Sequence, residues 1–405
     1  MHDVVDLRSD TLTLPTQAMR DAMAHAEVGD DVWEEDPTVR RLEDAAARRT
    51  GKEAVLFVSS GTQGNLVSVL AQTRAGQEVI LDADSHIFNY EGAGAAVFGG
   101  VQTLPVKTAR GFLTPAQVRE HIRPNNIHIP MTGLVAVENT HNRHGGTCCT
   151  PEEIEAVAAA ARAAGVPVHL DGARLFNAAI ALGRPVADFA RPVDSLTFCL
   201  SKGLGAPVGS LVCGSREFVA RARRVRKMLG GGMRQVGVLA AAGLVALDSM
   251  VDRLAEDHVN CRRLAEGVSR LPRVGLDLAT VQTNIVIFRV DRDGGAAELV
   301  TGCLARKVKI HQTGPGTIRC VTHRTSTPTT SSGPSRPSER SRRPGSRPHP
   351  RGGRTLWPSA CWTSRTSRPT SSPMKASCAR STASTSTSRR GRRWGSSGNR
   401  AAASR

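Results

Sequence analysis

Short apolar runs recur along the first half of the chain, and alanine-rich stretches lie between them. A short apolar run bounded by turn residues predicts a buried strand, whereas a longer stretch such as residues 151–164 predicts a helix. The predicted strands are residues 55–58, 79–81, 134–137, 166–170, 196–200 and 210–213. Strands that alternate with helices are typical of an α/β fold with a mostly parallel sheet and crossover helices.

Pattern and composition divide the chain into three parts. Residues 1–250 predict a large α/β domain that includes the N-terminal segment, and residues 251–323 predict a smaller, apparently truncated α+β domain. In the smaller part a helix ends near Val268, and strands are expected from Thr283 and from Thr317. Residues 324–405 contain no Val, Ile, Phe or Tyr. Such a segment cannot bury enough apolar surface to fold, so we expect a disordered tail.

The formal net charge of +18 comes almost entirely from this tail. The whole chain has 54 basic and 36 acidic residues. The tail has 17 Arg and one Lys against the single Glu339, which leaves 36 basic and 35 acidic residues for residues 1–323. A near-neutral body argues against nucleic-acid binding by residues 1–323. Any such binding is expected to be nonspecific and to come from the tail.

Nothing in the sequence predicts a membrane or secreted protein. No apolar run approaches the roughly 20 residues that span a bilayer. The first residues lack the basic and apolar regions of a secretory signal. The nine cysteines have no Cys-x-x-Cys spacing, which fits reduced thiols. We therefore expect a cytoplasmic protein.

Two of the predicted strands each lead into one ionisable residue. Asp171 follows the run 166–170, and Lys202 follows the run 196–200. Each has an ordinary explanation, since a lysine can extend to water and an aspartate can cap a turn or a helix. Together they match the needs of pyridoxal phosphate. A lysine amine forms a Schiff base with the cofactor, and a carboxylate keeps its ring nitrogen protonated.

A candidate phosphate site follows the first strand. Residues 56–65 read Leu-Phe-Val-Ser-Ser-Gly-Thr-Gln-Gly-Asn, and a helix-like run follows. The start of a helix presents free backbone N–H groups that favour an anion, here at Gly61 and Thr62. The alternative is an ordinary glycine turn with a serine cap. The stretch is not a Walker loop, because no Gly-Lys-Ser/Thr follows.

These stretches together resemble the low-specificity L-threonine aldolases, which are pyridoxal-phosphate enzymes with the aspartate-aminotransferase-like fold. The resemblance covers residues 3–323. It also rests on the segments Asp-Leu-Arg-Ser-Asp-Thr at 6–11, Asp-Ala-Asp-Ser-His at 82–86, Glu-Asn-Thr-His-Asn at 138–142 and Gly-Gly-Gly-Met-Arg-Gln at 230–235. It implies retro-aldol cleavage of L-threonine, L-allo-threonine and other β-hydroxy-α-amino acids. The products are glycine and an aldehyde such as acetaldehyde.

The resemblance also implies a role for each matching residue. The catalytic residues are Lys202, His86 and His128, and the two histidines are candidates for the base that removes the hydroxyl proton. The cofactor is bound by Lys202, Asp171, His86, Gly61, Thr62, Arg174, Lys227 and Arg234. The substrate carboxylate is bound by Ser9, Arg174 and Arg319. From local sequence alone, Ser9 also fits a turn cap, each histidine fits a structural role, and Lys227 lies in a basic stretch typical of a solvated helix face.

The same resemblance implies a homodimer or homotetramer. Lys227 and Arg234 match residues that approach the cofactor phosphate from the neighbouring subunit. The active sites would then be shared between subunits, with an amino acid as the small-molecule substrate.

A cluster of histidines and cysteines at residues 141–149 raises the question of a metal site. His141, His144, Cys148 and Cys149 are close in sequence. Adjacent cysteines cannot easily bind one tetrahedral zinc ion together, and the matching loop of the family carries no transition metal. We therefore predict no metal site here.

The resemblance ends abruptly at residue 323. A reading-frame shift near codon 323 explains the missing last helix and the near absence of acidic residues, and we prefer it to a natural basic tail. Three functional alternatives remain at this stage. They are a sister pyridoxal-phosphate enzyme (an aminotransferase or β-eliminating lyase), a nucleic-acid-binding protein that acts through its tail, and an inactive frameshifted product.

Overall fold

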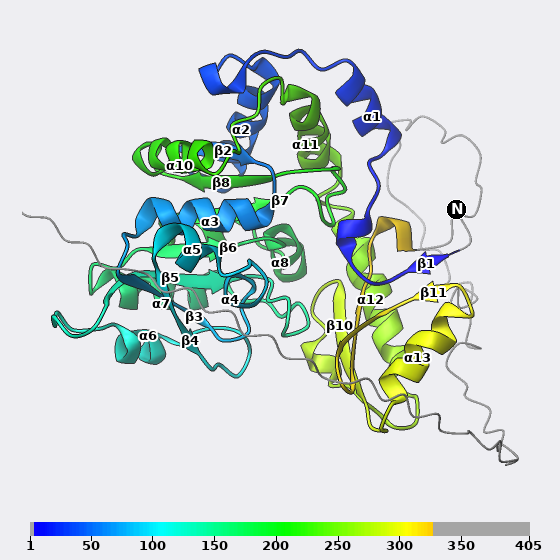
Figure 1. Cartoon of the computed structure of the whole chain (residues 1–405). Coiled ribbons are helices and arrows are strands. Elements are labelled where there is room, and N and C mark those ends of the chain that lie inside the picture. Colours follow the sequence, from blue (N-terminus) through cyan, green and yellow to red (C-terminus); the bar gives the residue numbers. More distant parts are fainter. Residues whose placement is uncertain (1–3, 327–405) are drawn as a thin grey trace, which may run out of the picture. The chain divides into compact units, whose positions relative to one another are not determined.

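The computed structural model describes residues 4–326 (Figure 1), and its central element is a seven-stranded sheet. The strand order is β2-β8-β7-β6-β5-β3-β4. Of these seven strands, β8 alone runs opposite to the other six. The strands are β2 (Ala54–Val58), β3 (Gln77–Asp82), β4 (Gln102–Val106), β5 (Met131–Glu138), β6 (Val168–Asp171), β7 (Ser195–Cys199) and β8 (Ser210–Gly214). The predicted α/β fold with a mostly parallel sheet is confirmed.

Helices follow most of these strands, as expected for crossover connections. They are α1 (Gln17–Ala24), α2 (Pro37–Thr50), α3 (Gly61–Gln72), α4 (His86–Asn89), α5 (Gly94–Gly99), α6 (Pro115–His121), α7 (Pro151–Arg162), α8 (Leu175–Leu182), α9 (Val186–Ala190), α10 (Arg216–Met228), α11 (Gly237–Ser249), α12 (Leu254–Val268) and α13 (Gly295–Leu304). Short 3₁₀ helices are η1 (Asp10–Leu12), η2 (Asp31–Trp33), η3 (Leu278–Thr280) and η4 (Arg324–Ser326).

The two faces of the sheet are buried by different helices, because successive strand residues point to opposite sides. Leu56 of β2 packs with Val67 of α3 and Phe218 of α10. The next residue, Phe57, belongs to the larger cluster that includes Leu42 of α2. Strands buried on both faces read as continuous apolar runs, which is why the sequence predicted them.

Residues 254–326 form a smaller part around a four-stranded antiparallel sheet of order β12-β13-β10-β9. Its strands are β9 (Val274–Gly275), β10 (Ile285–Val290), β12 (His311–Gly314) and β13 (Thr317–Val321). The start of the chain joins this part, because β1 (Val5–Asp6) pairs in parallel with β11 (Val308–Lys309). The described fold continues three residues past the predicted break, into η4. The predictions for residues 327–405 lie outside the described residues.

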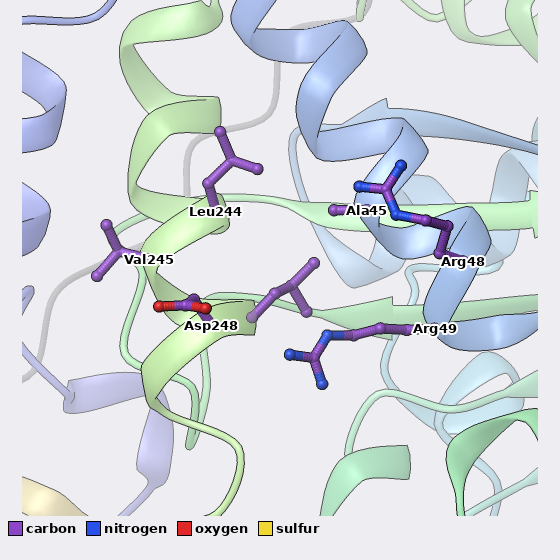
Figure 2. Close-up of a pocket in the computed structure, with 7 residues that line it drawn as sticks. Ala45, Arg48, Arg49, Leu244, Val245 and Asp248 are labelled. Atoms are coloured by element: carbon purple, nitrogen blue, oxygen red, sulfur yellow. The ribbon is translucent and has the colours of Figure 1, made fainter. Parts of the chain in front are cut away.

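The described residues contain no helix long and apolar enough to cross a membrane. A surface pocket of about 490 Å³ lies between α2 and α11, where Arg48 and Arg49 of α2 and Asp248 and three apolar side chains of α11 form the lining (Figure 2). None of the residues predicted for the functional site lines it. The predicted chemistry lies instead at one edge of the central sheet.

Candidate functional site

Most of the predicted site residues lie where the strands of the central sheet end. Parallel strands present their carboxyl ends at the same edge, where ligands of open α/β sheets bind. The last residue of β5 pairs with the last residue of β6, as Glu138 faces Asp171 in the register. His86 follows β3, and Lys202 follows β7. The topology therefore brings together residues that are up to 116 positions apart in the sequence.

Asp171 is buried and held in a fixed orientation. Its Oδ1 accepts the backbone N–H of Ala173 at 3.0 Å, and its Oδ2 accepts the side-chain amide of Asn65 at 2.7 Å. The Asn65 carbonyl in turn accepts the Thr197 hydroxyl at 2.9 Å and lies 3.2 Å from Nε2 of His169. Burial lowers the pKa of His169 to about 4, so this imidazole is neutral. A neutral network thus holds the Asp171 carboxylate in place.

His86 lies close to Asp171 and is held from two sides. Its backbone N–H donates to Glu138 Oε2 at 2.6 Å, and its Nδ1 lies 2.8 Å from Glu91 Oε1. One ligand-type atom from each of His86, Glu91 and Asp171 lies within 4.8 Å of the others. Burial alone would lower the pKa of His86, but the hydrogen bond to Glu91 and the charges of Asp171 and Glu91 raise it. For the Glu91 carboxyl, burial raises the pKa, and the negative charge of Asp171 adds to this rise.

Lys202 is half-buried in the loop after β7. The Thr13 hydroxyl donates to its carbonyl at 2.8 Å, which ties this loop to the N-terminal segment. Its positive charge contributes to the lowered pKa of Asp10 and opposes the rise in the pKa of His86. The amine therefore lies in the same electrostatic environment as the imidazole and the buried carboxylates.

The candidate phosphate site is the start of α3, as predicted. Ser60 caps the helix by accepting the backbone N–H of Gln63 at 3.1 Å. The preceding amides of Gly61 and Thr62 belong to the first helical turn, where N–H groups lack a partner in the helix. A Cβ at Gly61 would lie 2.8 Å from Cys199 Sγ, so this position has room only for glycine. The helix start can therefore lie close against β7.

The predicted carboxylate-binding residues are held by polar partners that the sequence did not predict. Arg174 is buried and donates from Nε and Nη2 to the two oxygens of Asp10, both at 2.7 Å. Its remaining Nη1 lies 3.4 Å from Asn142 Oδ1, and Arg319 Nη1 donates to the same oxygen at 2.8 Å. Ser9 caps η1 immediately before Asp10 and accepts from Thr11. Two guanidinium groups thus converge on one acceptor, and a carboxylate can replace this amide oxygen.

Of the predicted residues, His128 lies away from this edge, whereas Lys227 and Arg234 flank a glycine loop that lies against Gln63 at the start of α3. His128 is exposed and precedes β5, at the amino end of the strand whose carboxyl end carries Glu138. At ~3.3 Å per residue, the eight residues of β5 separate it from the site by more than 20 Å. Lys227 is exposed at the end of α10. Arg234 has a 56% exposed side chain, and its Nη1 lies 2.9 Å from Asp30.

The residues at the sheet edge fit pyridoxal phosphate. Asp171 and Glu91 are buried carboxylates that share the amide donor of Asn65, at 2.7 and 2.8 Å. A protonated ring nitrogen supplies the further donor and positive charge that this pair of carboxylates can accept. The amides at Gly61 and Thr62 suit the phosphate.

Sequence reasoning missed four polar residues that orient the site. They are Asp10, Asn65, Glu91 and Asn142; three lie inside or at the end of a stretch used for the resemblance, and Glu91 lies five residues after one. Nothing in their local sequence distinguishes them from turn or cap residues. Their partners are distant in the sequence, as the 164 positions between Asp10 and Arg174 illustrate.

Comparisons with known proteins find threonine aldolases among both the similar sequences and the similar structures. The model of the beta-eliminating lyase family matches residues 6–291. The low-specificity L-threonine aldolase 1 of Arabidopsis thaliana is 48% identical over 291 residues, 71% of this chain and 81% of the relative. The low specificity L-threonine aldolase of Escherichia coli K12 is 44% identical over 321 residues, 79% of this chain and 94% of the relative. A solved threonine aldolase of Leishmania major has a TM-score of 0.68 at 22% identity, covering 78% of this chain and 94% of that structure.

Proposed function

The chain belongs to the beta-eliminating lyase family and, within it, to the low-specificity L-threonine aldolases, and we propose that it cleaves L-threonine to glycine and acetaldehyde. L-allo-threonine and other β-hydroxy-α-amino acids are further substrates under this proposal. The cofactor is pyridoxal phosphate. The observation that carries the proposal is the convergence of Lys202, Asp171 and His86 at one sheet edge, beside two guanidinium groups that share Asn142.

The guanidinium groups orient the substrate. Arg174 and Arg319 bind the amino-acid carboxylate at the place where their Nη1 groups now meet Asn142, and Ser9 adds a hydroxyl from the N-terminal segment. Guanidinium donors match a carboxylate in geometry and charge. Asp10 fixes Arg174 from the opposite side, so the guanidinium is already aligned before substrate arrives. Alignment of this kind can supply roughly 7–11 kcal/mol of the barrier.

The remaining residues position the cofactor and move one proton. Lys202 holds the cofactor covalently, Asp171 holds its ring nitrogen, and Gly61 and Thr62 hold its phosphate. When bound, the group supplies an electron sink for the pair released as the Cα–Cβ bond breaks. His86, beside Asp171, would accept the proton of the β-hydroxyl, whose oxygen becomes the aldehyde oxygen. A proton returned to Cα completes glycine.

His128, Lys227 and Arg234 act across subunits in this proposal. Their exposure in a single protomer and the length of β5 support such an arrangement. Mixing inactive Lys202→Ala subunits with inactive Arg234→Ala subunits is expected to restore activity if sites are shared. No recovery after verified subunit exchange would contradict sharing.

The cytoplasm is the compartment we propose, and the seven free cysteines of the described residues support it. The frameshift origin of the tail, and its nonspecific affinity for nucleic acid, also stay proposals. The nucleic-acid affinity of the tail is tested by comparing the binding of the full chain with that of a chain ending at residue 326.

Product analysis tests the function. The full chain is incubated with pyridoxal phosphate and L-threonine, and glycine, acetaldehyde, ammonia and 2-oxo acids are quantified. Equal amounts of glycine and acetaldehyde are expected. Ammonia with 2-oxobutanoate would instead show a β-eliminating lyase, and a 2-oxo acid formed only with an amino acceptor would show an aminotransferase. Formation of none of these products by a chain that binds the cofactor would identify an inactive product.

A further inference from the structure

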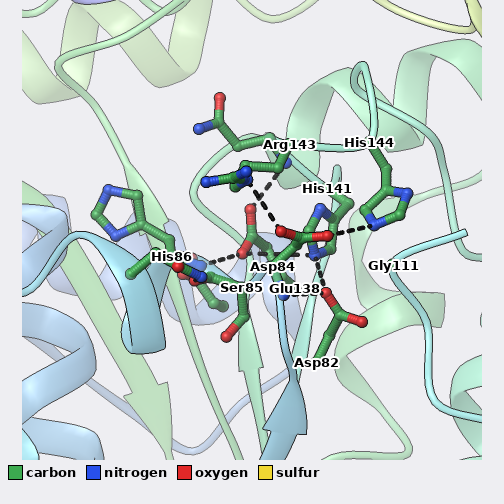
Figure 3. Close-up of polar contacts among 12 residues, drawn as sticks. Asp82, Asp84, Ser85, His86, Gly111, Glu138, His141, Arg143 and His144 are labelled. Carbon is green, nitrogen blue, oxygen red and sulfur yellow. Dashed lines mark hydrogen bonds and ion pairs between the residues drawn. The ribbon is translucent and has the colours of Figure 1, made fainter. Parts of the chain in front are cut away.

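A second cluster of ionisable side chains lies beside the proposed active site and takes no part in it (Figure 3). Asp82 is the last residue of β3, and His141 and His144 lie in the loop after β5. One ligand-type atom from each of the three lies within 4.8 Å of the other two. The rings of His141 and His144 meet edge to face with centroids 4.7 Å apart. The cluster therefore brings two imidazoles and a carboxylate to one point.

The cysteines of this loop are not part of that cluster. Cys148 and Cys149 are buried, and burial raises the pKa of Cys148 to about 12 and that of Cys149 further still. Neither thiol is a ready thiolate ligand. The fold brings the two histidines to Asp82, and not to these cysteines.

Three of the four ring nitrogens of His141 and His144 are buried without a hydrogen bond to any described residue. His141 is fully buried, yet neither of its ring nitrogens has a hydrogen-bond partner, and Nε2 of His144 has none either. His141 Nε2 lies 3.1 Å from Asp82 Oδ1, but the contact does not have the direction of a hydrogen bond. Buried polar groups are nearly always paired, so these nitrogens require an explanation.

A shared cation explains both the short distance between His141 Nε2 and Asp82 Oδ1 and the poor direction of this contact for a hydrogen bond. Ligands bound to one tetrahedral Zn²⁺ at about 2.0–2.1 Å lie about 3.3 Å from each other and point at the ion, not at each other. The separation of His141 Nε2 and Asp82 Oδ1 is close to this value. Asp84 Oδ2 lies 3.5 Å from His144 Nε2, near enough to complete the site or to hold a bound water.

The surroundings orient the three side chains as a ligand set. The Thr108 hydroxyl donates to Asp82 Oδ2 at 2.7 Å, and the backbone N–H of Asp84 donates at 2.8 Å to Oδ1, the oxygen that lies 3.1 Å from His141 Nε2. Gly111 lies against both rings, where a Cβ would approach His141 within 2.5 Å and His144 within 3.0 Å. Supporting contacts of this kind fix ring orientation at metal sites.

We propose that Asp82, His141 and His144 bind one divalent transition-metal ion, best matched by Zn²⁺ because of the mixed nitrogen and oxygen ligands. The ion stabilises the loop that carries Asn142, and through it the position of Arg174 and Arg319. The site is separate from the cofactor residues, so it does not depend on the proposed function.

Equilibrium dialysis of Zn²⁺ against the full chain, stripped of metal and loaded with pyridoxal phosphate, tests the proposal. The comparison uses His144→Gln and Asp82→Asn, two variants at different positions, and His25→Gln as an exposed histidine control. We expect one equivalent bound with an affinity that falls at least ~100-fold in both site variants and is unchanged in the control. Co²⁺ used as a spectroscopic probe is expected to show visible d–d absorption that Zn²⁺ abolishes.

Two results would overturn the proposal. One is no Zn²⁺ bound by the unmodified chain. The other is binding by His144→Gln and Asp82→Asn that equals that of the unmodified chain, which would assign the ion to other residues. His141 would then be an imidazolium paired with Asp82 and Glu138, whose carboxylates lie 3.1 and 3.9 Å away.

Discussion

Asp10 anchors the guanidinium group of Arg174, and Asp10→Asn removes the charge from this buried ion pair while keeping the side-chain volume. Asp10 is 0% exposed and accepts two hydrogen bonds from Arg174, with a third from Asn284 at 3.2 Å. Burial alone would raise the pKa of Asp10, but Arg174 and Lys202 hold it well below its usual range. Asp10 is therefore ionised at every pH at which the enzyme is studied.

The cost of the substitution follows from the charge that remains. Removing one partner of a buried ion pair costs about 3–5 kcal/mol, because the other charge stays buried and uncompensated. Arg319 lies next to Arg174 through Asn142, so the unpaired guanidinium also faces a like charge. Asparagine can still accept one of the two hydrogen bonds, so we expect a loss of about 3 kcal/mol in the free energy of unfolding. A misplaced Arg174 should also raise KM for L-threonine at least ~10-fold, which corresponds to about 1.4 kcal/mol.

Urea unfolding and steady-state kinetics measure both effects. Asp6→Asn is the matched control, because Asp6 pairs with Arg8 at the surface of the same segment and such pairs contribute about 0–1 kcal/mol. The pKa of Asp10 is lowered on folding, so its ionised carboxylate contributes fully to the free energy of unfolding above about pH 4. This contribution is lost only as pH falls toward the folded-state pKa. The stability difference should therefore be constant from about pH 5 to 8. A loss no larger than that of Asp6→Asn, with unchanged KM, would refute the reasoning.

Two further predictions concern other residues of the site. Glu91→Gln removes the negative charge that raises the pKa of His86 and weakens the hydrogen bond to its Nδ1, so the acidic limb of the kcat–pH profile should move to lower pH. An unmoved limb would mean that His86 is not the base. Gly61→Ala places a Cβ 2.8 Å from Cys199 Sγ at the start of the phosphate site. We expect at least ~10-fold weaker binding of pyridoxal phosphate by titration, and ~1–3 kcal/mol of overpacking. Gly267→Ala, where a Cβ meets nothing within 4 Å, should leave affinity unchanged, and equal affinity in both variants would count against the phosphate site.

The sequence predicted the central sheet well because its strands are buried on both faces. The predicted runs correspond to β2, β3, β5, β6, β7 and β8, each within a few residues of its observed bounds. The edge strand β4 was not predicted, because Gln-Thr-Leu-Pro-Val contains a proline and half-exposed positions. Edge strands of this kind lack a continuous apolar run, so periodicity does not detect them.

The candidate site could be predicted only where a residue type carries chemistry by itself. Lys202, Asp171 and the glycine turn before α3 were predicted from strand ends and turn chemistry, and the structure places them at one edge of the sheet. Asn65 and Asn142 could not be, because an amide acquires a role only when distant segments supply its partners. The direction of β5 places His128 at the opposite edge of the sheet from Asp171, and one sequence cannot show whether a second subunit brings such a residue back.

The central claim is that Lys202 holds pyridoxal phosphate in an aldolase site, and one spectroscopic experiment tests it most directly. The full chain is titrated with pyridoxal phosphate, the visible absorption band of the bound cofactor is recorded, and L-threonine is then added. Lys202→Ala is compared with Lys107→Ala, an exposed lysine elsewhere in the large domain. We predict a band and glycine release in the unmodified chain and in Lys107→Ala, and neither in Lys202→Ala. An unchanged band in Lys202→Ala would contradict the account.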